Sequence, residues 1–438
     1  MSFFPTWTLK RSGEIAPDER LPAGQTLALG LQHVVAMFGS TALAPILMGF
    51  DPNTAIFFSG IGTLIFFVMT GGRLPSYLGS SFAFIAVVIA ATGYSGPGPN
   101  PNVGVALGGI VACGVVYAAI GIVVHRAGRA WIERLMPPVV TGAIVAAIGL
   151  NLAPVAVKSV SGSGFDTAVG LVTALAVGLV SVRARGMPRR LPILIGAAFA
   201  YGLYLVLANG FGLGKPIDFS RLASAAWIGL PNFTSPVFTA PAMILIAPIA
   251  VILVAENLGH IKGIAAMTGR DYDPLIGRGF LADGLATIIS GFGGGTGVTT
   301  YAENMGVMAV TRIYSTLVFV AAALVAIGLG FSPKFGALIL TIPVPVIGGL
   351  ALVVFGLIAA TGGRIWVQDR TDFANPRNLV TAAVALIAGA GDLTVKLGDF
   401  ALGGIGTATF GAILVYHLLG RGPAEPERVA PADAPLAS

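Results

Sequence analysis

Pro138-Val-Val-Thr-Gly-Ala-Ile-Val-Ala-Ala-Ile-Gly-Leu150 is a charge-free stretch whose pattern returns late in the chain. The second copy reads Pro345-Val-Ile-Gly-Gly-Leu-Ala-Leu-Val-Val-Phe-Gly-Leu357, with Pro, Gly and Gly-Leu at identical spacing. A segment of about 20 mostly apolar residues can cross a bilayer as a helix. The two copies therefore predict two equivalent membrane-spanning helices, one in each half of the chain.

The composition as a whole is typical of a membrane protein. Of 438 residues, 55% are hydrophobic and only 10% are charged, whereas about a quarter of a soluble domain is charged. The 61 glycines suit closely packed membrane helices. The single cysteine, Cys113, excludes an internal disulfide and a cysteine metal site, and we expect no metal and no cofactor. The net charge of +6 is scattered along loops, so no nucleic-acid partner is expected.

Hydropathy predicts fourteen membrane-spanning segments. The weakest are the third, ninth and tenth, which are short or are interrupted by Gly, Ser, Thr and charge. The predicted segments are 24–48, 53–70, 76–93, 103–124, 135–157, 165–182, 191–212, 238–261, 275–294, 296–311, 313–331, 337–361, 378–395 and 399–419.

Basic residues indicate the orientation of these segments. With the N-terminus in the cytoplasm, five of the 25 Lys and Arg residues fall outside, which leaves 20 inside. Such an excess of positive charge marks the cytoplasmic side. We therefore expect a multi-pass protein with both termini in the cytoplasm. The five outer residues are Lys158, Lys215, Arg221, Lys334 and Lys396.

The two copies of the opening pattern form the fifth and twelfth predicted segments, which are seven apart. Because seven is odd, the two halves of the chain must have opposite orientations in the membrane. Inverted repeats of this kind are typical of secondary transporters. The predicted fold is thus all-α and polytopic, a seven-plus-seven inverted repeat.

The third and tenth segments are interrupted at corresponding positions, by Leu78-Gly-Ser-Ser-Phe-Ala-Phe84 and Gly293-Gly-Gly-Thr-Gly-Val-Thr-Thr-Tyr-Ala-Glu303. Paired interruptions point to a binding site near the midplane. Non-helical backbone at that depth must be buried in protein or line a cavity. The aromatic residues there, at positions 82 and 301, could stack on a planar ring or simply pack.

Ionisable side chains also lie inside the predicted segments. Glu256 and His260 stand four residues apart on one helical face, Glu303 lies in the tenth segment and His33 in the first. Such groups cost energy in a bilayer and are functional by default. We expect a polar central pocket, although a Glu256–His260 pair and His33 could also brace helices. Asp283 fits a packing role and a functional role equally well.

These residues together resemble the nucleobase–ascorbate transporters, also called nucleobase–cation symporter family 2. The family signature is Gln or Glu, Asn, any, Gly, four of any, Thr, then Arg, Lys or Gly, and Glu303-Asn-Met-Gly-Val-Met-Ala-Val-Thr-Arg312 matches it. Further motifs match at Gln32-His33, at Ser80-Ser-Phe-Ala-Phe84, and at the Glu and His of the eighth segment. The resemblance covers about residues 18–420 and is strongest to the uracil permease branch, including pyrimidine permeases of the pyrimidine-utilisation type.

The resemblance implies a core domain and a gate domain, with short strands in segments three and ten. It also implies proton-driven uptake of a pyrimidine base across the bacterial inner (cytoplasmic) membrane, and a homodimer. The implied parts are a cytoplasmic lead (1–23), a core domain (24–124 and 238–331), a gate domain (125–212 and 332–419), an extracellular loop (213–237) and a disordered cytoplasmic tail (420–438).

Carried over position by position, the resemblance implies that Glu256 and Glu303 hold the ring N–H and carbonyl edge of the base. Phe82 would pack against the ring, and Tyr301 and Ala302 would line the pocket. His260 would bond to Glu256 and take part in proton coupling.

Behind these residues, His33, Gln32 and Asn304 would support the site. Ala302 departs from the better-known uracil permeases, which have Gly there, and its methyl group could narrow the pocket or alter base preference.

Three alternatives remain beside a pyrimidine carrier. One is a purine or ascorbate carrier, although xanthine and urate carriers tend to have Gln at the position of Glu303. The second is an anion transporter or channel, for which Glu256 and Glu303 would repel the substrate. The third is a membrane enzyme, which is not expected because the sequence holds no metal-ligand cluster, phosphate loop or nucleophile–base pair.

Overall fold

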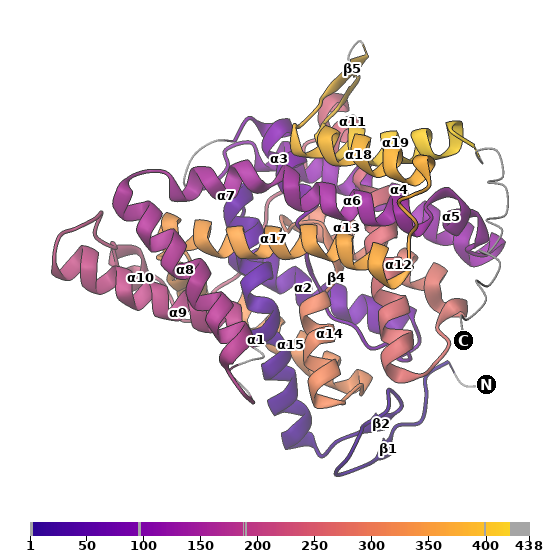
Figure 1. Cartoon of the computed structure of the whole chain (residues 1–438). Coiled ribbons are helices and arrows are strands. Elements are labelled where there is room, and N and C mark those ends of the chain that lie inside the picture. Colours follow the sequence, from indigo (N-terminus) through magenta and orange to yellow (C-terminus); the bar gives the residue numbers. More distant parts are fainter. Residues whose placement is uncertain (1–2, 95–97, 187, 189–190, 398–399, 421–438) are drawn as a thin grey trace, which may run out of the picture.

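A computed structural model of the chain describes residues 3–94, 98–186, 188, 191–397 and 400–420, most of which form helices (Figure 1). Within these residues, nine helical segments are long and apolar enough to span a membrane. They are α1 (Ala23–Met48), α2 (Pro52–Met69), α4 (Val103–Ala127), α6 with α7 (Pro138–Asn151 and Ala153–Val160), α8 (Gly164–Arg183), α9 with a π-helical turn (Pro192–Tyr204 and Leu205–Gly210), α11 with α12 (Ala240–Ile246 and Ile249–Thr268), α13 with its leading 3-10 turn (Ile276–Gly293 and Asp273–Leu275), and α17 (Val344–Gln368).

A tenth span is reached if α15 (Thr316–Gly330) and α16 (Pro333–Ile339), which meet at 88°, count as one. The other four predicted segments contain shorter helices. These are α3 (Phe84–Thr92), α14 (Ala302–Thr311), α18 (Pro376–Ala390) and α19 (Gly404–Leu418). The count of fourteen therefore stays a prediction.

The predicted boundaries of the twelfth segment, 337–361, are wrong. Residues 337–339 belong to α16, and the long helix α17 begins at Val344 and continues to Gln368. Pro343 precedes the helix as its N-cap and Pro345 lies in its first turn. Proline is tolerated in a first turn, where its missing N–H has no helical partner, but not inside a helix.

Two three-residue strands interrupt the predicted third and tenth segments, as expected. In β3 (Leu78–Ser80) and β4 (Val298–Thr300), Leu78 lies opposite Thr300 and Ser80 opposite Val298 in an antiparallel pair. Both strands are wholly buried. Their mutual pairing satisfies backbone groups that could find no water inside a membrane. A side chain at Gly79 would overlap the Tyr301 ring, so glycine is needed there.

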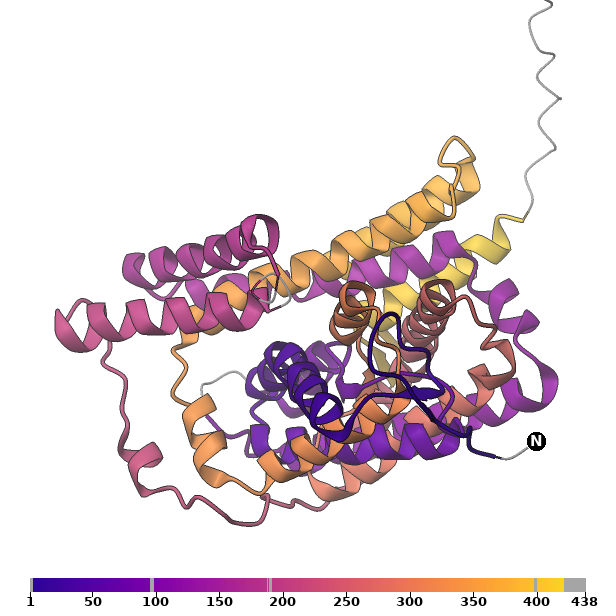
Figure 2. The same ribbon diagram turned by 90° about the horizontal axis from the view of Figure 1, so that it is seen from below.

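The helices form two bundles. The first bundle contains α1–α4 and α12–α15, and the second contains α6–α9 and α17–α19. In Figure 2, α8, α9, α17 and α18 lie above the helices of the first bundle. The small elements are α5 (Ala130–Leu135), α10 (Ser220–Ser224), the parallel pair β1 (Thr8–Leu9) and β2 (Glu19–Arg20), and the hairpin β5 (Val395–Leu397) with β6 (Phe400–Leu402).

Glycines let the helices of each bundle approach backbone to backbone. In the first bundle, Gly114 of α4 lies against Gly284 and Ile288 of α13. In the second, Gly149 of α6 lies against Ala359 of α17, whereas Gly142 lies against Gly362. The two helices that carry the repeated pattern therefore pack antiparallel. Small residues at such crossings are characteristic of membrane helix pairs.

The N-terminal lead, predicted only as cytoplasmic, is folded against the helices. Residues 3–21 pack against the first bundle through β1, β2 and a bridge from Ile15 to Ile313. Ile15 is fully buried. Most of the predicted C-terminal tail, 421–438, lies outside the described residues.

Candidate functional site

Glu303 lies where β4 gives way to α14. It occupies the first turn of this helix, where the helix dipole favours negative charge. Its carboxylate accepts a short hydrogen bond from Ser40 Oγ of α1. The residue is only partly buried, and its chain neighbour Ala302 is exposed. The carboxylate of Glu303 is therefore fixed by Ser40 without being fully enclosed.

Glu256 faces the same region from the middle of α12. Its neighbours Ala255 and Asn257 are 2% and 0% exposed, whereas Glu256 itself is only partly buried. Its carboxylate accepts no hydrogen bond from any residue that the structure describes, and it interacts electrostatically with Glu303. The fold thus brings the two predicted acidic residues together, and one of them has free acceptor atoms.

Phe82 and Ala302 each follow one of the two paired strands, and Ala302 directly precedes Glu303. Phe82 follows β3 and is 9% exposed, and its ring meets Phe355 of α17 edge to face at 5.8 Å. It therefore joins the first bundle to the second. Ala302 is exposed, so its methyl group faces open space. Contact of either residue with a ligand stays a prediction.

Tyr301 braces the strand pair. Its hydroxyl donates to the Ser80 carbonyl at 2.8 Å and accepts from Thr41 Oγ1 at 3.0 Å. The side chain is 4% exposed. These bonds join β3, α1 and the start of α14 into one rigid corner. The expected role of Tyr301 in lining the pocket stays a prediction.

His260 bonds to a different partner from the one expected. Its Nδ1 lies 2.8 Å from Thr300 Oγ1 of β4, and no Glu256–His260 hydrogen bond occurs among the described residues. Thr300 Oγ1 in turn donates to Asn257 Oδ1 at 3.2 Å. His260 is therefore tied to the strand pair, although it shares a helical face with Glu256.

Asp283 of α13 ends this chain of hydrogen bonds. Its Oδ2 accepts from Asn257 Nδ2 at 2.5 Å, and the Tyr117 hydroxyl lies 3.5 Å away. All three side chains are fully buried. Buried polar groups of this kind must be hydrogen-bonded. The network runs from His260 through the strand pair to α13, so Asp283 has a structural connection to the site.

His33 of α1 and Asn304 of α14 connect these two helices at the start of α14. Asn304 Nδ2 lies 3.0 Å from His33 Nδ1 and donates to the His33 carbonyl at 3.1 Å. The His33 ring packs on Phe319 of α15 with centroids 4.6 Å apart. Gln32, which directly precedes His33, is also buried, and its Nε2 has no hydrogen-bond partner among the described residues.

Sequence reasoning missed Ser40 and Thr41, which bind Glu303 and Tyr301. A signal was present, because Ser40 lies seven residues after His33 and so falls two turns along the same face of α1. It also missed Thr300 and Asn257, which connect His260 to Asp283. Within the described residues, no group of three or more His, Cys, Asp or Glu could hold a metal ion.

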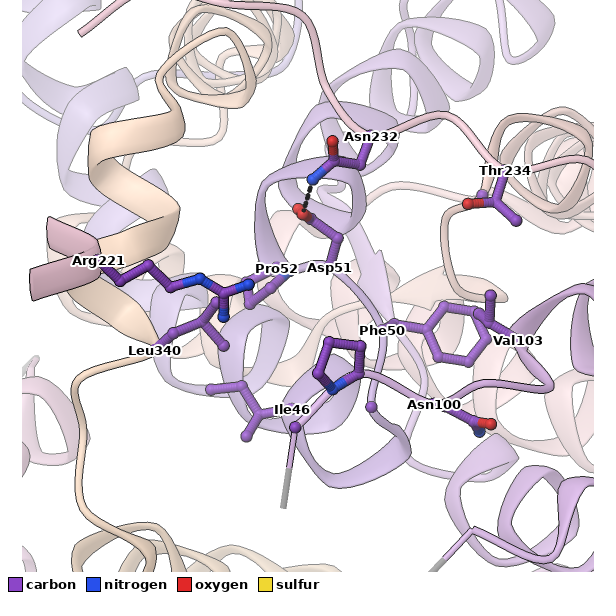
Figure 3. Close-up of a pocket in the computed structure, with 14 residues that line it drawn as sticks. Ile46, Phe50, Asp51, Pro52, Asn100, Val103, Arg221, Asn232, Thr234 and Leu340 are labelled. Atoms are coloured by element: carbon purple, nitrogen blue, oxygen red, sulfur yellow. Dashed lines mark hydrogen bonds between the residues drawn. The ribbon is translucent and has the colours of Figure 1, made fainter. Parts of the chain in front are cut away.

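A separate cavity of about 240 Å³ lies at the α1–α2 turn (Figure 3). Its lining includes Asp51, Arg221 and Asn232, and neither acidic residue of the site contributes to it. Asp51 caps α2 by accepting from Thr54 N at 3.0 Å and also accepts from Asn232 Nδ2 at 2.6 Å. The bond from Asn232 holds the long α9–α11 connection against the first bundle.

Two helical bundles, a central pair of broken segments and an acidic pair beside them define a polytopic membrane transporter. The model of a permease family, Xan_ur_permease, matches residues 24–398. The chain belongs to this family, whose members are transporters and not enzymes.

Named relatives extend this assignment. The protein called "Putative pyrimidine permease RutG" of Escherichia coli (strain K12) is 64% identical over 95% of this chain and 96% of its own length. The "Uracil permease" of Paenibacillus larvae is 42% identical over 92% of this chain and 95% of its own. A solved structure of SLC26A9 matches 89% of this chain and 64% of that longer chain with a TM-score of 0.64 at 14% identity, which shows a shared fold.

Proposed function

We propose that this protein carries uracil and related pyrimidine bases, with thymine as a further candidate, into the cell together with protons. The observation that carries the proposal is the acidic pair, because Glu256 and Glu303 are both only partly buried and lie close enough to interact electrostatically. Uracil has ring N–H donors and carbonyl acceptors on a flat ring. Carboxylates accept N–H donors in strong, charge-assisted hydrogen bonds, and an aromatic side chain such as Phe82 can pack on the ring face.

The relatives support this substrate class. The names of both curated relatives specify a pyrimidine or uracil permease, and their similarity extends over more than nine tenths of the chain. The signature of the tenth segment, which begins at Glu303, lies within the matched region. Glu at this position, where xanthine and urate carriers tend to have Gln, favours uracil over purines.

The transport cycle that we propose is elevator-like. The first bundle acts as the core domain and carries the base past the second bundle, which acts as the gate domain. Moving an uncompensated charge through an apolar barrier is costly. Protonation at Glu256, with His260 beside it, would therefore decide which loaded states can move. In this proposal the protein has fourteen spans, works as a homodimer in the inner membrane, and keeps both termini in the cytoplasm.

The alternatives predict different binding behaviour. A purine or ascorbate carrier would prefer xanthine or ascorbate to uracil. An anion transporter would need a cationic site, and Glu256 and Glu303 would repel its substrate. Competition between unlabelled ligands at equilibrium separates all three possibilities.

The test is equilibrium binding of labelled uracil to purified protein. We expect Glu256→Gln and Glu303→Gln each to raise the Kd about 10- to 100-fold, because a hydrogen bond to a charged group contributes about 1.5–3 kcal/mol. Thymine should compete, and xanthine and ascorbate should not. Asp372→Asn, an exposed loop change, is the matched control. Wild-type affinity in both glutamine variants would refute the site.

A further inference from the structure

The N-terminal clamp, residues 3–21, meets the far end of the helix that carries Glu303. Ile15 N donates to the Arg312 carbonyl at 2.9 Å, and Tyr314 N donates back to the Ile15 carbonyl at 2.8 Å. Arg312 and Tyr314 flank the corner where α14 ends and α15 is about to begin. The clamp thus pairs with this corner as a short parallel strand would.

A second set of contacts fixes the clamp to the start of α15. Thr316 Oγ1 accepts from Trp7 Nε1 at 3.0 Å and lies 3.1 Å from the Pro17 carbonyl and 2.9 Å from the Gly72 carbonyl. Thr316 is 1% exposed. The Trp7 ring also stacks on Phe67 of α2 with centroids 5.9 Å apart. One buried hydroxyl therefore connects the clamp to both α15 and the end of α2.

The corner held by the clamp is strained. Arg312 adopts a φ of 54°, a left-handed conformation that is unfavourable for a residue with a side chain. Such conformations persist where the surroundings over-determine them. The ion pair between Arg312 and Glu14, at 3.7 Å, comes from the clamp as well. The contacts of the clamp offset the strain at this corner.

The helix that ends at this corner is lightly packed. Of the residues in α14, Asn304, Val307 and Met308 are buried, and Gly306 and Val310 are exposed. Its first turn is fixed by the Tyr301 brace and its last turn by the clamp. A ten-residue helix moves as a rigid rod, so a shift at one end displaces the other.

We propose that the N-terminal clamp is a positioning element for the binding site, and that it sets the place of Glu303 through the α14–α15 corner. Ile15 and Thr316 are the positioning residues, and neither touches the substrate. The effect on binding rests on the proposed role of Glu303, whereas the effect on α14 itself does not.

The experiment has one readout that needs no substrate. Hydrogen–deuterium exchange of the amides in 304–311 is measured on ligand-free protein, and the uracil Kd is measured separately. We expect Ile15→Asp and Thr316→Val to speed exchange of these amides about tenfold and to raise the Kd about tenfold, which corresponds to about 1.4 kcal/mol. Trypsin cleavage at Arg11 reports that the clamp has come away.

Two matched variants show whether the effect is specific. Thr316→Ser keeps the hydroxyl and should behave as wild type. Thr381→Val removes a buried hydroxyl that bonds only within α18, and it should alter neither readout. Should Ile15→Asp fail to fold, Trp7→Ala takes its place. It removes the hydrogen bond to Thr316 and the stacking on Phe67 but keeps the backbone bonds of Ile15, so we expect the same changes at about threefold.

Unchanged α14 exchange, or an unchanged Kd, in a variant whose clamp is cleaved at Arg11 would overturn the proposal. The proposed function fails in a different way, because wild-type protein would then bind no uracil. In that case faster α14 exchange in the clamp variants would still establish the mechanical role of the clamp.

Discussion

The half-helices α3 and α14 follow paired strands, yet their sequences equip them for different tasks. Val87 and Val88 of α3 are buried, and this helix contains no charged residue. In contrast, α14 carries Glu303 and Asn304 in its first turn and leaves Gly306 exposed. The same kind of backbone break therefore occurs twice. The helix after the first break is a packing helix, whereas the proposed function assigns the polar groups of α14 to the substrate.

The largest expected effect is the loss of uptake on changing Glu303 in α14, compared with the loss of stability on changing a packed residue in α3. Glu303→Gln should reduce uracil uptake about 100-fold with little loss of thermal stability, because a charge-assisted hydrogen bond is lost and no packed group is removed. Val88→Ala in α3 should instead lower the free energy of unfolding by about 1–2 kcal/mol and keep the KM of the folded protein. Uptake kinetics and melting curves of both variants measure these effects. A stability loss in Glu303→Gln together with an uptake loss in Val88→Ala would contradict the assigned roles of the two helices.

Phe82 tests whether the α3 side contributes anything to binding. Phe82→Ala should raise the KM for uracil about tenfold, because it removes both the ring face offered to the base and the edge-to-face contact with Phe355. Phe82→Leu serves as the control, since it restores bulk without an aromatic face. If both variants transport like wild type, Phe82 is a packing residue and α3 has no direct part in binding.

Tyr301 tests the corner that joins the two half-helices. Tyr301→Phe keeps the ring and loses the hydroxyl bonds to Ser80 and Thr41. We expect a loss of about 1–2 kcal/mol in stability and a threefold fall in uptake at most, which is a smaller change than at Glu303. Thermal unfolding in detergent measures the first quantity. A loss of uptake as large as that of Glu303→Gln would mean that the hydroxyl binds the base directly.

The smallest expected effect is a loss of stability of the N-terminal clamp at acid pH. The Ala16 N–H, at 2.8 Å, and the Lys10 ammonium hold the pKa of the Glu19 carboxyl below its usual range. A lowered pKa stabilises the clamp above the ordinary Glu pKa of about 4.3. This stabilisation is lost as pH falls through the lowered value. Trypsin cleavage at Arg11 needs near-neutral pH, so exchange labelling of residues 8–20 across the acid range is the suitable measurement.

Glu19→Gln is the control for that titration. It should loosen residues 8–20 at neutral pH and remove the acid dependence, since glutamine does not titrate. Acid-dependent exchange that persists in this variant would assign the effect to another group.

Local pattern was enough to predict several parts of the molecule. Long apolar runs predicted a membrane protein, Gly and Ser clusters predicted the breaks now seen as β3 and β4, and buried charges pointed to Glu256 and Glu303. These features are encoded within one segment at a time.

Long-range partners were not predictable in this way. Ser40 and Glu303 are 263 positions apart, and although helical spacing places Ser40 on the His33 face of α1, it does not identify Glu303 as the partner. His260 shares a face with Glu256, as spacing predicted, but β4 brings Thr300 within hydrogen-bond distance of its ring. The clamp was missed because its backbone bonds to Arg312 and Tyr314 leave no side-chain pattern and its side-chain partners, such as Thr316 for Trp7, lie as far as 309 positions away.

In the proposed function the acidic pair binds a pyrimidine base whose movement is coupled to protons. Labelled uracil uptake into proteoliposomes, with and without an inward proton gradient, is the decisive measurement. We expect accumulation that requires the gradient, stops with a protonophore and is competed by thymine. Uptake by well-folded protein that is indifferent to the gradient, or no uracil uptake at all, would contradict the proposed function.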